Sequence, residues 1–301
     1  MKVKGSWVAI PTPFKKDQSV NLSGFEKIID FHVENNTDGL LILGSAGESS
    51  MLSQQEKKEI IEFTVDYCKG KIPALIGTTG SDTATSIQMS LFAQQAGADG
   101  ILMVLPAYIK PPQPDIIKFY QEVAEAIDIP LAVYNNPSRV GTNMEADTLI
   151  KISKLPNVTA IKEAMGNVEQ LIKVRKEIDD RIDVLTCDAP VYSIIIPNLA
   201  IGGAGVTNIS GNLAPAELAA LSQEWQNFAD IARSKKLLFE YFELMEVCYM
   251  AVNPIVIKAG MNLYGLPAGI PRKPLQPLAG EQLKRLEKVM KKLNLIDKYS
   301  Q

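Results

Sequence analysis

The sequence contains a single histidine, His32, among 301 residues. Histidine is the usual base beside a serine nucleophile, the partner of many catalytic cysteines and the commonest metal ligand in proteins. One histidine therefore argues against a serine-histidine triad, a cysteine-histidine dyad and a histidine-rich metal site. His32 shares a helical pattern with Ile28, Ile29 and Phe31, which predicts a packed or surface residue and not a catalytic one.

Cysteine is also scarce, and long apolar runs are missing. Cys68, Cys187 and Cys248 are odd in number and widely spaced, which fits a reducing compartment and neither a disulfide framework nor a zinc site. No apolar run is long enough to span a bilayer, and no signal peptide is apparent. The formal net charge of -3 argues against nucleic acid and anionic membranes as partners. We expect a cytoplasmic protein.

Short apolar runs alternate with helical patterns along most of the chain. The runs occupy residues 7–10, 39–43, 74–76, 100–105, 131–134, 158–161, 182–185 and 203–209. Strands that are apolar throughout and alternate with helices are typical of a parallel sheet buried on both faces. Eight of them, with a repeat of roughly 20 to 35 residues, predict an α/β fold of the (β/α)8 TIM barrel class.

The last part of the chain lacks strand-like runs. Residues 214–301 have helical patterns, interrupted by a proline-rich segment at 266–277. We therefore predict a barrel over residues 1–225 and a C-terminal helical extension over residues 226–301, packed on the barrel and not independent of it.

In a barrel of this class the active site lies at the carboxyl ends of the strands, so the residues that follow each predicted strand are candidates for it. The second run leads into the small-residue loop Gly44–Ser49, and the fourth leads to Tyr108. The fifth leads through Tyr134 to Arg139, and the sixth leads to Lys162. Each has an ordinary structural alternative: the loop as a tight turn, a tyrosine as a wedge between strand and helix, and Arg139 as the partner of a surface acid.

Lys162 poses the sharpest chemical question. An ammonium at the end of a buried strand must pair with a carboxylate, reach water, or lose its proton through a lowered pKa. The last outcome is how lysines become Schiff-base nucleophiles. An ion pair with the adjacent Glu163 or another acid is the alternative, although Glu163 should point to the opposite face of the strand.

Four segments together resemble the dihydrodipicolinate synthase / N-acetylneuraminate lyase family. They are Gly44–Ser49, Tyr134–Arg139, Ile161–Ala164 and Asn253–Lys258, and their order and spacing match over almost the whole chain. The resemblance implies a (β/α)8 barrel with a helical extension, assembled as a homotetramer from dimers. It implies that Lys162 forms an imine with pyruvate, while Tyr134 shuttles protons to the imine and the pyruvate methyl. No metal and no dissociable cofactor are expected, because the imine acts as the electron sink.

The same resemblance assigns roles to other residues. Ser45, where the synthases usually have threonine, and Tyr108, contributed across a dimer interface, would complete a proton relay with Tyr134. Gly44 lets the loop backbone approach the pyruvate carboxylate, and Ala46 stands where the synthases have a second hydroxyl. The N–H groups of Ser45 and Ala46 remain able to bind the carboxylate, and Thr207 is expected to offer backbone contacts to the keto acid.

Arg139 favours one branch of the family. In the synthases, an arginine at this place receives the carboxylate of L-aspartate 4-semialdehyde, which is condensed with pyruvate on the lysine branch. The enzyme resembles a class I lyase of that type. Ala46 and the segment 205–215 point instead towards aldolases of 2-keto-3-deoxy sugar acids, which we keep as the alternative.

Two further predictions concern the glycine run before the eighth strand and an acid after the seventh. Gly202–Gly205 is a candidate phosphate-binding loop, or phosphate cradle. The protein would then be a phosphosugar-binding barrel in which Lys162 contributes only its positive charge. Asp188 is either a residue at the acceptor end of the site or a helix N-cap.

Regulation also differs from the family pattern. The positions that hold feedback lysine in lysine-inhibited synthases carry Gln54, Lys57, Thr85 and Ala107 here. Lys57 would repel a cationic ligand, and Thr85 lacks the acid that would bind its ammonium. We therefore predict insensitivity to L-lysine.

Overall fold

The computed structural model describes residues 1–300 and contains a closed barrel of eight parallel strands in sequential order. The strands are β1 (Gly5–Ala9), β2 (Gly39–Ile42), β3 (Ala74–Gly77), β4 (Gly100–Val104), β5 (Leu131–Asn135), β6 (Val158–Glu163), β7 (Asp183–Cys187) and β8 (Gly205–Asn208). Each predicted run overlaps one strand, with ends that differ by up to two residues. Because β1 pairs with β8, the barrel has no open sheet edge. The predicted fold class is confirmed.

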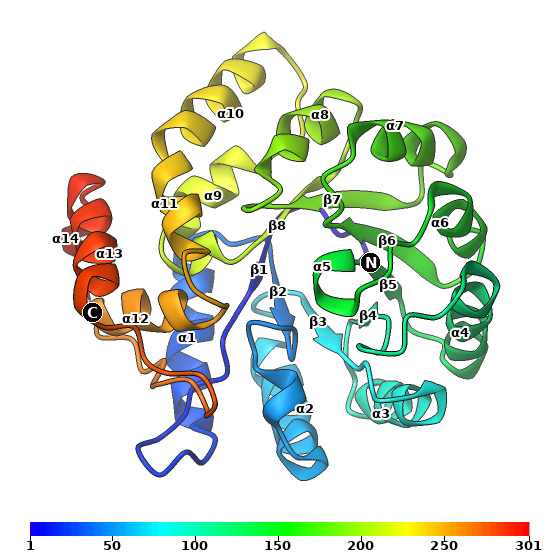
Figure 1. Cartoon of the computed structure of the whole chain (residues 1–301), viewed down its shortest axis with the longest axis horizontal. Coiled ribbons are helices and arrows are strands. Elements are labelled where there is room, and N and C mark those ends of the chain that lie inside the picture. Colours follow the sequence, from blue (N-terminus) through cyan, green and yellow to red (C-terminus); the bar gives the residue numbers. More distant parts are fainter. Residues whose placement is uncertain (301) are drawn as a thin grey trace.

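Helices surround the barrel and also extend beyond it. They are α1 (Leu22–Glu34), α2 (Gln54–Cys68), α3 (Thr83–Gln95), α4 (Gln113–Ala126), α5 (Pro137–Val140), α6 (Ala146–Ile152), α7 (Val168–Glu177), α8 (Ile195–Ala200), α9 (Pro215–Leu221), α10 (Phe228–Glu240), α11 (Phe242–Cys248), α12 (Ile255–Leu263), α13 (Gly280–Lys292) and α14 (Leu295–Tyr299). Figure 1 shows the ring of helices around the central strands. Within residues 1–300, no helix has the length and apolar character needed to cross a membrane.

The C-terminal helices lie against one side of the barrel. In Figure 1, α11 to α14 gather beside α1, and α13 contacts α11, α12 and α14. One continuous buried apolar cluster includes Leu41 of the barrel and Leu244, Met261 and Met290 of these helices. Such a shared core agrees with helices appended to the barrel. The boundary predicted between residues 225 and 226 falls in the loop before α10 and stays a prediction.

His32 is fully buried inside α1. Its Nδ1 lies 2.9 Å from the Thr37 hydroxyl and its Nε2 lies 3.4 Å from the Asn212 amide oxygen. Burial lowers the pKa of His32 to about 4, so the ring is neutral near pH 7. Of the packed and surface positions predicted for the only histidine, the structure shows the packed one.

Candidate active site

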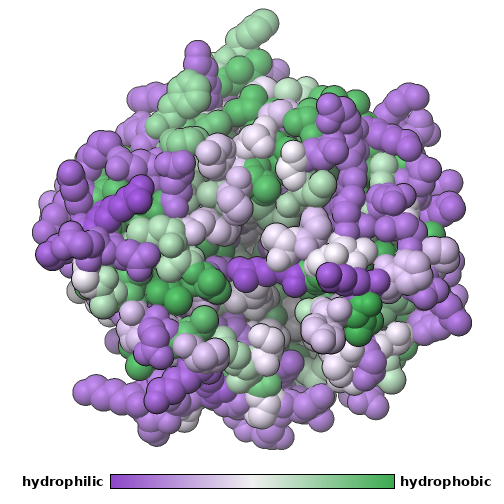
Figure 2. Space-filling view, in the orientation of Figure 1, coloured by the Kyte–Doolittle hydropathy of each residue, from purple (hydrophilic) through white to green (hydrophobic). Residues whose placement is uncertain are grey.

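A cavity of about 670 Å³ opens at the carboxyl ends of the strands. Figure 2 shows the hollow at the centre of this face. Six of the residues singled out from the sequence line it: Ser45, Tyr134, Arg139, Lys162, Asp188 and Thr207. The barrel brings them together because the carboxyl ends of all its strands meet at one rim.

Lys162 is the next-to-last residue of β6 and lines the cavity. Within residues 1–300, no carboxylate lies within ion-pairing distance of its ammonium, whose Nζ sits 4.1 Å from the centre of the Tyr134 ring. Burial lowers the pKa of Lys162, and the positive charge of Arg139 acts in the same direction, while Cys187 and Asp188 oppose them. A desolvated lysine of this kind is a usable amine nucleophile.

Glu163 points away from Lys162, as the alternation of side chains along a strand requires. Its carboxylate accepts hydrogen bonds from the Asn135 amide at 2.9 and 3.1 Å, from the Met165 N–H at 2.7 Å and from the Gln170 amide at 3.3 Å. Burial raises the pKa of Glu163 to about 7. An ion pair with Lys162 is therefore excluded, and the prediction that Glu163 faces outward is confirmed.

Tyr134 comes from β5, which pairs with β6 so that Tyr134 stands beside Lys162. Its hydroxyl oxygen accepts a hydrogen bond of 2.6 Å from the Asn136 amide. Burial raises the pKa of Tyr134 well above its usual range, contacts with Cys187 add to the rise, and the Asn136 amide and Arg139 act against it. The phenol is neutral at physiological pH and has a proton to give.

The ends of β7 and β8 form another wall. The Cys187 sulfur lies 3.3 Å from the Thr207 hydroxyl, which in turn donates to the Thr186 carbonyl at 3.2 Å. Asp188 is buried, and its carboxylate accepts from the Ser210 N–H and hydroxyl and from the Tyr249 hydroxyl. It also accepts from the N–H of Ile209. Asp188 therefore anchors the turn after β8, and it caps no helix by the usual N-cap pattern.

The glycine loop contributes one residue, Ser45, to the lining of the cavity. Ser45 is exposed and lines the cavity, but the Ala46 side chain is fully buried, and neither Ala46 nor Gly44 lines the cavity. Within residues 1–300, the N–H groups of Ser45 and Ala46 have no hydrogen-bond acceptor. Unpaired backbone N–H groups in a turn of small residues can bind an anion, and that of Ser45 belongs to a residue that lines the cavity.

Contacts with the C-terminal extension and with Thr12 hold the loop in place. Lys258 Nζ pairs with Glu48 Oε1 at 2.5 Å, and the Arg272 N–H donates to the other oxygen of Glu48 at 2.8 Å. Thr12 donates its hydroxyl to the Gly47 carbonyl at 2.6 Å. These contacts fix the loop even though Glu48 itself has a left-handed backbone, with φ 53°.

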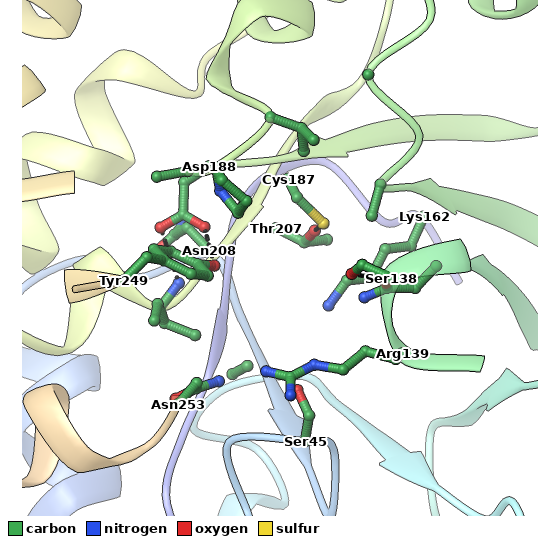
Figure 3. A pocket seen from close by; sticks show the side chains of 18 of the residues that line it. Ser45, Ser138, Arg139, Lys162, Cys187, Asp188, Thr207, Asn208, Tyr249 and Asn253 are labelled. Atoms are coloured by element: carbon green, nitrogen blue, oxygen red, sulfur yellow. Dashed lines mark hydrogen bonds between the residues drawn. The ribbon is translucent and has the colours of Figure 1, made fainter. Parts of the chain in front are cut away.

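Arg139 stands on α5, the short helix that follows β5 and lies in front of the strands in Figure 1. Figure 3 shows its side chain reaching across the cavity between Ser45 and Asn253. Among the ion pairs of residues 1–300, none involves Arg139. The alternative role as partner of a surface acid is therefore not supported, and the guanidinium is available to a carboxylate.

Two predicted features lie away from the cavity. Tyr108 is 94% exposed, with a left-handed backbone at φ 80°, and it does not line the cavity of a single chain. Gly202 and Gly203 precede β8, at the opposite end of the barrel, and the N–H of Gly203 is bonded to the Asn198 carbonyl at 2.7 Å. The prediction of a phosphate cradle is therefore wrong. The glycine run forms the turn into β8, and its N–H groups already donate to backbone carbonyls.

The sequence over residues 2–293 matches a family model that is described as the dihydrodipicolinate synthetase family. The chain belongs to this family.

Relatives and solved structures of the family agree along almost the full length. A 4-hydroxy-tetrahydrodipicolinate synthase of Clostridium novyi (strain NT) is 36% identical over 291 residues, covering 97% of this chain and 97% of that protein. The crystal structure of dihydrodipicolinate synthase from Aquifex aeolicus has a TM-score of 0.92 and 33% identity, covering 97% and 99%. That of the enzyme from Cyanidioschyzon merolae with lysine bound has a TM-score of 0.92 and 29% identity, covering 97% and 98%.

Several cavity residues were not singled out from the sequence. They are Asn136, Cys187, Asn208, Tyr249 and Asn253. Asn253 opens one of the four segments that carry the family resemblance, and Asn136 lies inside another, so both had a signal. Tyr249 had none, because its contact with Asp188 joins residues 61 positions apart.

Proposed function

We propose that the protein condenses pyruvate with L-aspartate 4-semialdehyde to 4-hydroxy-tetrahydrodipicolinate, in lysine and diaminopimelate biosynthesis. Membership of the family and relatives of that name along the whole chain support the reaction. The observation that carries it is Lys162: a buried amine with a lowered pKa, facing the cavity beside a phenol and without a carboxylate partner in residues 1–300.

The chemistry follows from these neighbours. The neutral Lys162 amine attacks the keto carbon of pyruvate, and loss of water from the carbinolamine gives an iminium. Tyr134 gives the proton that the departing hydroxyl needs and later takes one from the pyruvate methyl. The resulting enamine carbon then attacks the aldehyde. The iminium is the electron sink, so the reaction requires neither a metal nor a dissociable cofactor.

Both substrate carboxylates have a suitable counterpart. The unpaired N–H groups of Ser45 and Ala46 fit the pyruvate carboxylate, with the Ser45 hydroxyl beside them, although Ala46 removes one side-chain hydrogen bond. Arg139, whose side chain reaches across the cavity in Figure 3, fits the carboxylate of the semialdehyde through two parallel hydrogen bonds.

The substrates are small molecules, and we further propose a cytoplasmic homotetramer built from dimers. Three buried free cysteines are in keeping with a reducing compartment. Tyr108 and Ile109 form an apolar, exposed tip next to β4. Such a tip suits a subunit contact, through which Tyr108 would reach the cavity of the partner.

Borohydride trapping tests the imine. Pyruvate plus borohydride should modify Lys162 irreversibly and abolish turnover, and peptide mapping should find the adduct on that lysine. Lys162→Ala should trap no pyruvate while keeping its thermal unfolding midpoint. Full activity after treatment, or an adduct on another lysine, would rule the imine out.

Steady-state kinetics then tests the acceptor. The wild type should have a far higher kcat/KM for the condensation of L-aspartate 4-semialdehyde than for the cleavage of 2-keto-3-deoxygluconate. Arg139→Ala should lose about tenfold to a hundredfold in kcat/KM for the semialdehyde, because a charge-assisted pair is lost. Its trapping by pyruvate should be unchanged. Equal or better cleavage of the sugar acid would favour the aldolase alternative.

A further inference from the structure

The hydroxyl of Tyr134 has a hydrogen-bond donor inside its own chain. The amide Nδ2 of Asn136 lies 2.6 Å from the phenol oxygen, and the amide Oδ1 of Asn136 accepts from the Ser138 hydroxyl at 2.7 Å. Asn136 is buried, at 7% exposure, and lines the cavity. Ser138, Asn136 and Tyr134 thus form a short chain of hydrogen bonds that ends at the phenol.

Asn136 is also in an unusual situation for its place in the fold. It is the N-cap residue of α5, where an asparagine side chain normally accepts from the helix backbone, yet its side chain makes no such bond. The amide is turned to Tyr134 instead. Its oxygen is occupied by the Ser138 hydroxyl, which leaves the N–H for the phenol.

An N–H donor on the phenol oxygen has two effects. It leaves the phenol's own proton free to point into the cavity, towards the substrate imine on Lys162. It also stabilises the phenolate that forms once this proton has left, as a hydrogen bond to the charged form does. The Asn136 amide opposes burial in setting the pKa of Tyr134, which agrees with this direction.

The relay expected from the family resemblance is not assembled within one chain. Ser45 makes no hydrogen bond to Tyr134 among residues 1–300, and Tyr108 projects into solvent. Asn136 therefore supplies the phenol with a hydrogen bond from its own chain, which requires no partner subunit.

We propose that Asn136 is a positioning residue for the proton transfers at Tyr134, with its amide N–H holding the phenol oxygen and stabilising the phenolate. Ser138 orients the amide. The inference rests on the proposed imine between Lys162 and pyruvate, but it does not depend on the identity of the aldehyde.

Deuterium exchange into the pyruvate methyl group in D2O, followed by NMR across a pH series, isolates this step from the acceptor. Asn136→Leu should slow exchange about tenfold to a hundredfold, because a hydrogen bond to a charged group is lost. The rising limb of the pH profile should move to higher pH by about one unit or more. Ser138→Ala should shift both in the same direction and by less.

Asn136→Asp separates donation from mere space filling. Its carboxylate cannot donate to the phenol and repels the phenolate, so its exchange should be slower than that of Asn136→Leu. Asn157→Leu is the matched control: Asn157 donates only to backbone carbonyls of Ala124 and Ile127, at the far end of β6. The folded control should keep the wild-type pH limb.

Borohydride trapping at equilibrium distinguishes a failure of the role of Asn136 from a failure of the proposed imine. All Asn136 variants should trap pyruvate to the same final extent as the wild type. Normal trapping with an unchanged exchange rate and pH limb in Asn136→Leu would overturn the role of Asn136 and leave the imine standing. Faster exchange in Asn136→Asp than in Asn136→Leu would also overturn it. A wild type that traps no pyruvate would instead overturn the proposed function, and this role with it.

Discussion

Lys162 and Glu163 are neighbours in the chain with opposite surroundings. Lys162 faces a cavity in which no carboxylate of residues 1–300 is free to pair with it, because Asp188 is already held by several donors. Glu163 faces the helices and is surrounded by N–H groups. One strand thus lowers the pKa of a base on one face and raises that of an acid on the other, through burial in both cases.

The single histidine gives a pH dependence that can be assigned to one residue. Burial holds the pKa of His32 at about 4 in the folded protein, against 6.5 when exposed. Between these values the unfolded chain binds the proton and the folded chain does not. Stability is therefore complete above pH 6.5 and falls by up to about 1.4 kcal/mol per pH unit as the pH drops towards 4.

Thermal unfolding of the wild type and of His32→Gln, compared at each pH, tests this expectation. Glutamine keeps a donor and an acceptor for Thr37 and Asn212 but does not titrate. The advantage of the wild type should shrink between pH 6.5 and pH 5, while carboxylates titrate alike in both proteins. A gap that stays constant over this range would contradict a neutral, buried His32.

At the scale of elements, the C-terminal extension holds the glycine loop. Lys258 of α12 and Glu48 of the loop are both at most 2% exposed, and Arg272 contacts Glu48 through its backbone and Glu56 of α2 through its guanidinium. The extension therefore sets the position of the loop that carries Ser45 and Ala46, of which Ser45 lines the cavity.

Lys258→Met should cost about 3 to 5 kcal/mol of unfolding free energy, because it leaves the Glu48 carboxylate buried and without its cation. Binding of pyruvate should weaken at the same time, since the loop loses its support. Urea unfolding measures the first effect and the pyruvate KM the second.

Two variants make this result interpretable. The double variant Lys258→Met, Glu48→Gln should recover much of the lost stability, because the buried charge is gone. Lys4→Met breaks an ion pair of 2.7 Å on the surface and should cost no more than about 1 kcal/mol. If Lys258→Met costs as little as Lys4→Met, the buried pair does not hold the loop.

At the scale of the whole molecule, we predict that L-lysine does not inhibit the enzyme. The structure of the relative from Cyanidioschyzon merolae has lysine bound. At the positions where the family resemblance predicts a feedback site, this chain carries Lys57, which adds a positive charge, and Thr85, whose hydroxyl is bonded to Asp82 at the start of α3. Initial rates of condensation should be the same with and without millimolar L-lysine. Half-inhibition at such concentrations would show that other residues bind it.

The sequence by itself determined the fold class, the approximate strands and the rim residues Lys162, Tyr134 and Arg139. These predictions depend on local features. The spacing of apolar residues and the residues at the carboxyl end of each strand are both found among near neighbours in the chain. The outward direction of Glu163 followed from the same alternation.

Only the tertiary structure decided which side chains meet. It joined Glu48 to Lys258 and Asp188 to Tyr249, turned Asn136 to Tyr134, and left Tyr108 outside the cavity of its own chain. Such contacts depend on how the barrel closes and on how loops pack over its rim. Distances between residues far apart in the chain are set by that packing, which no local pattern of residues records.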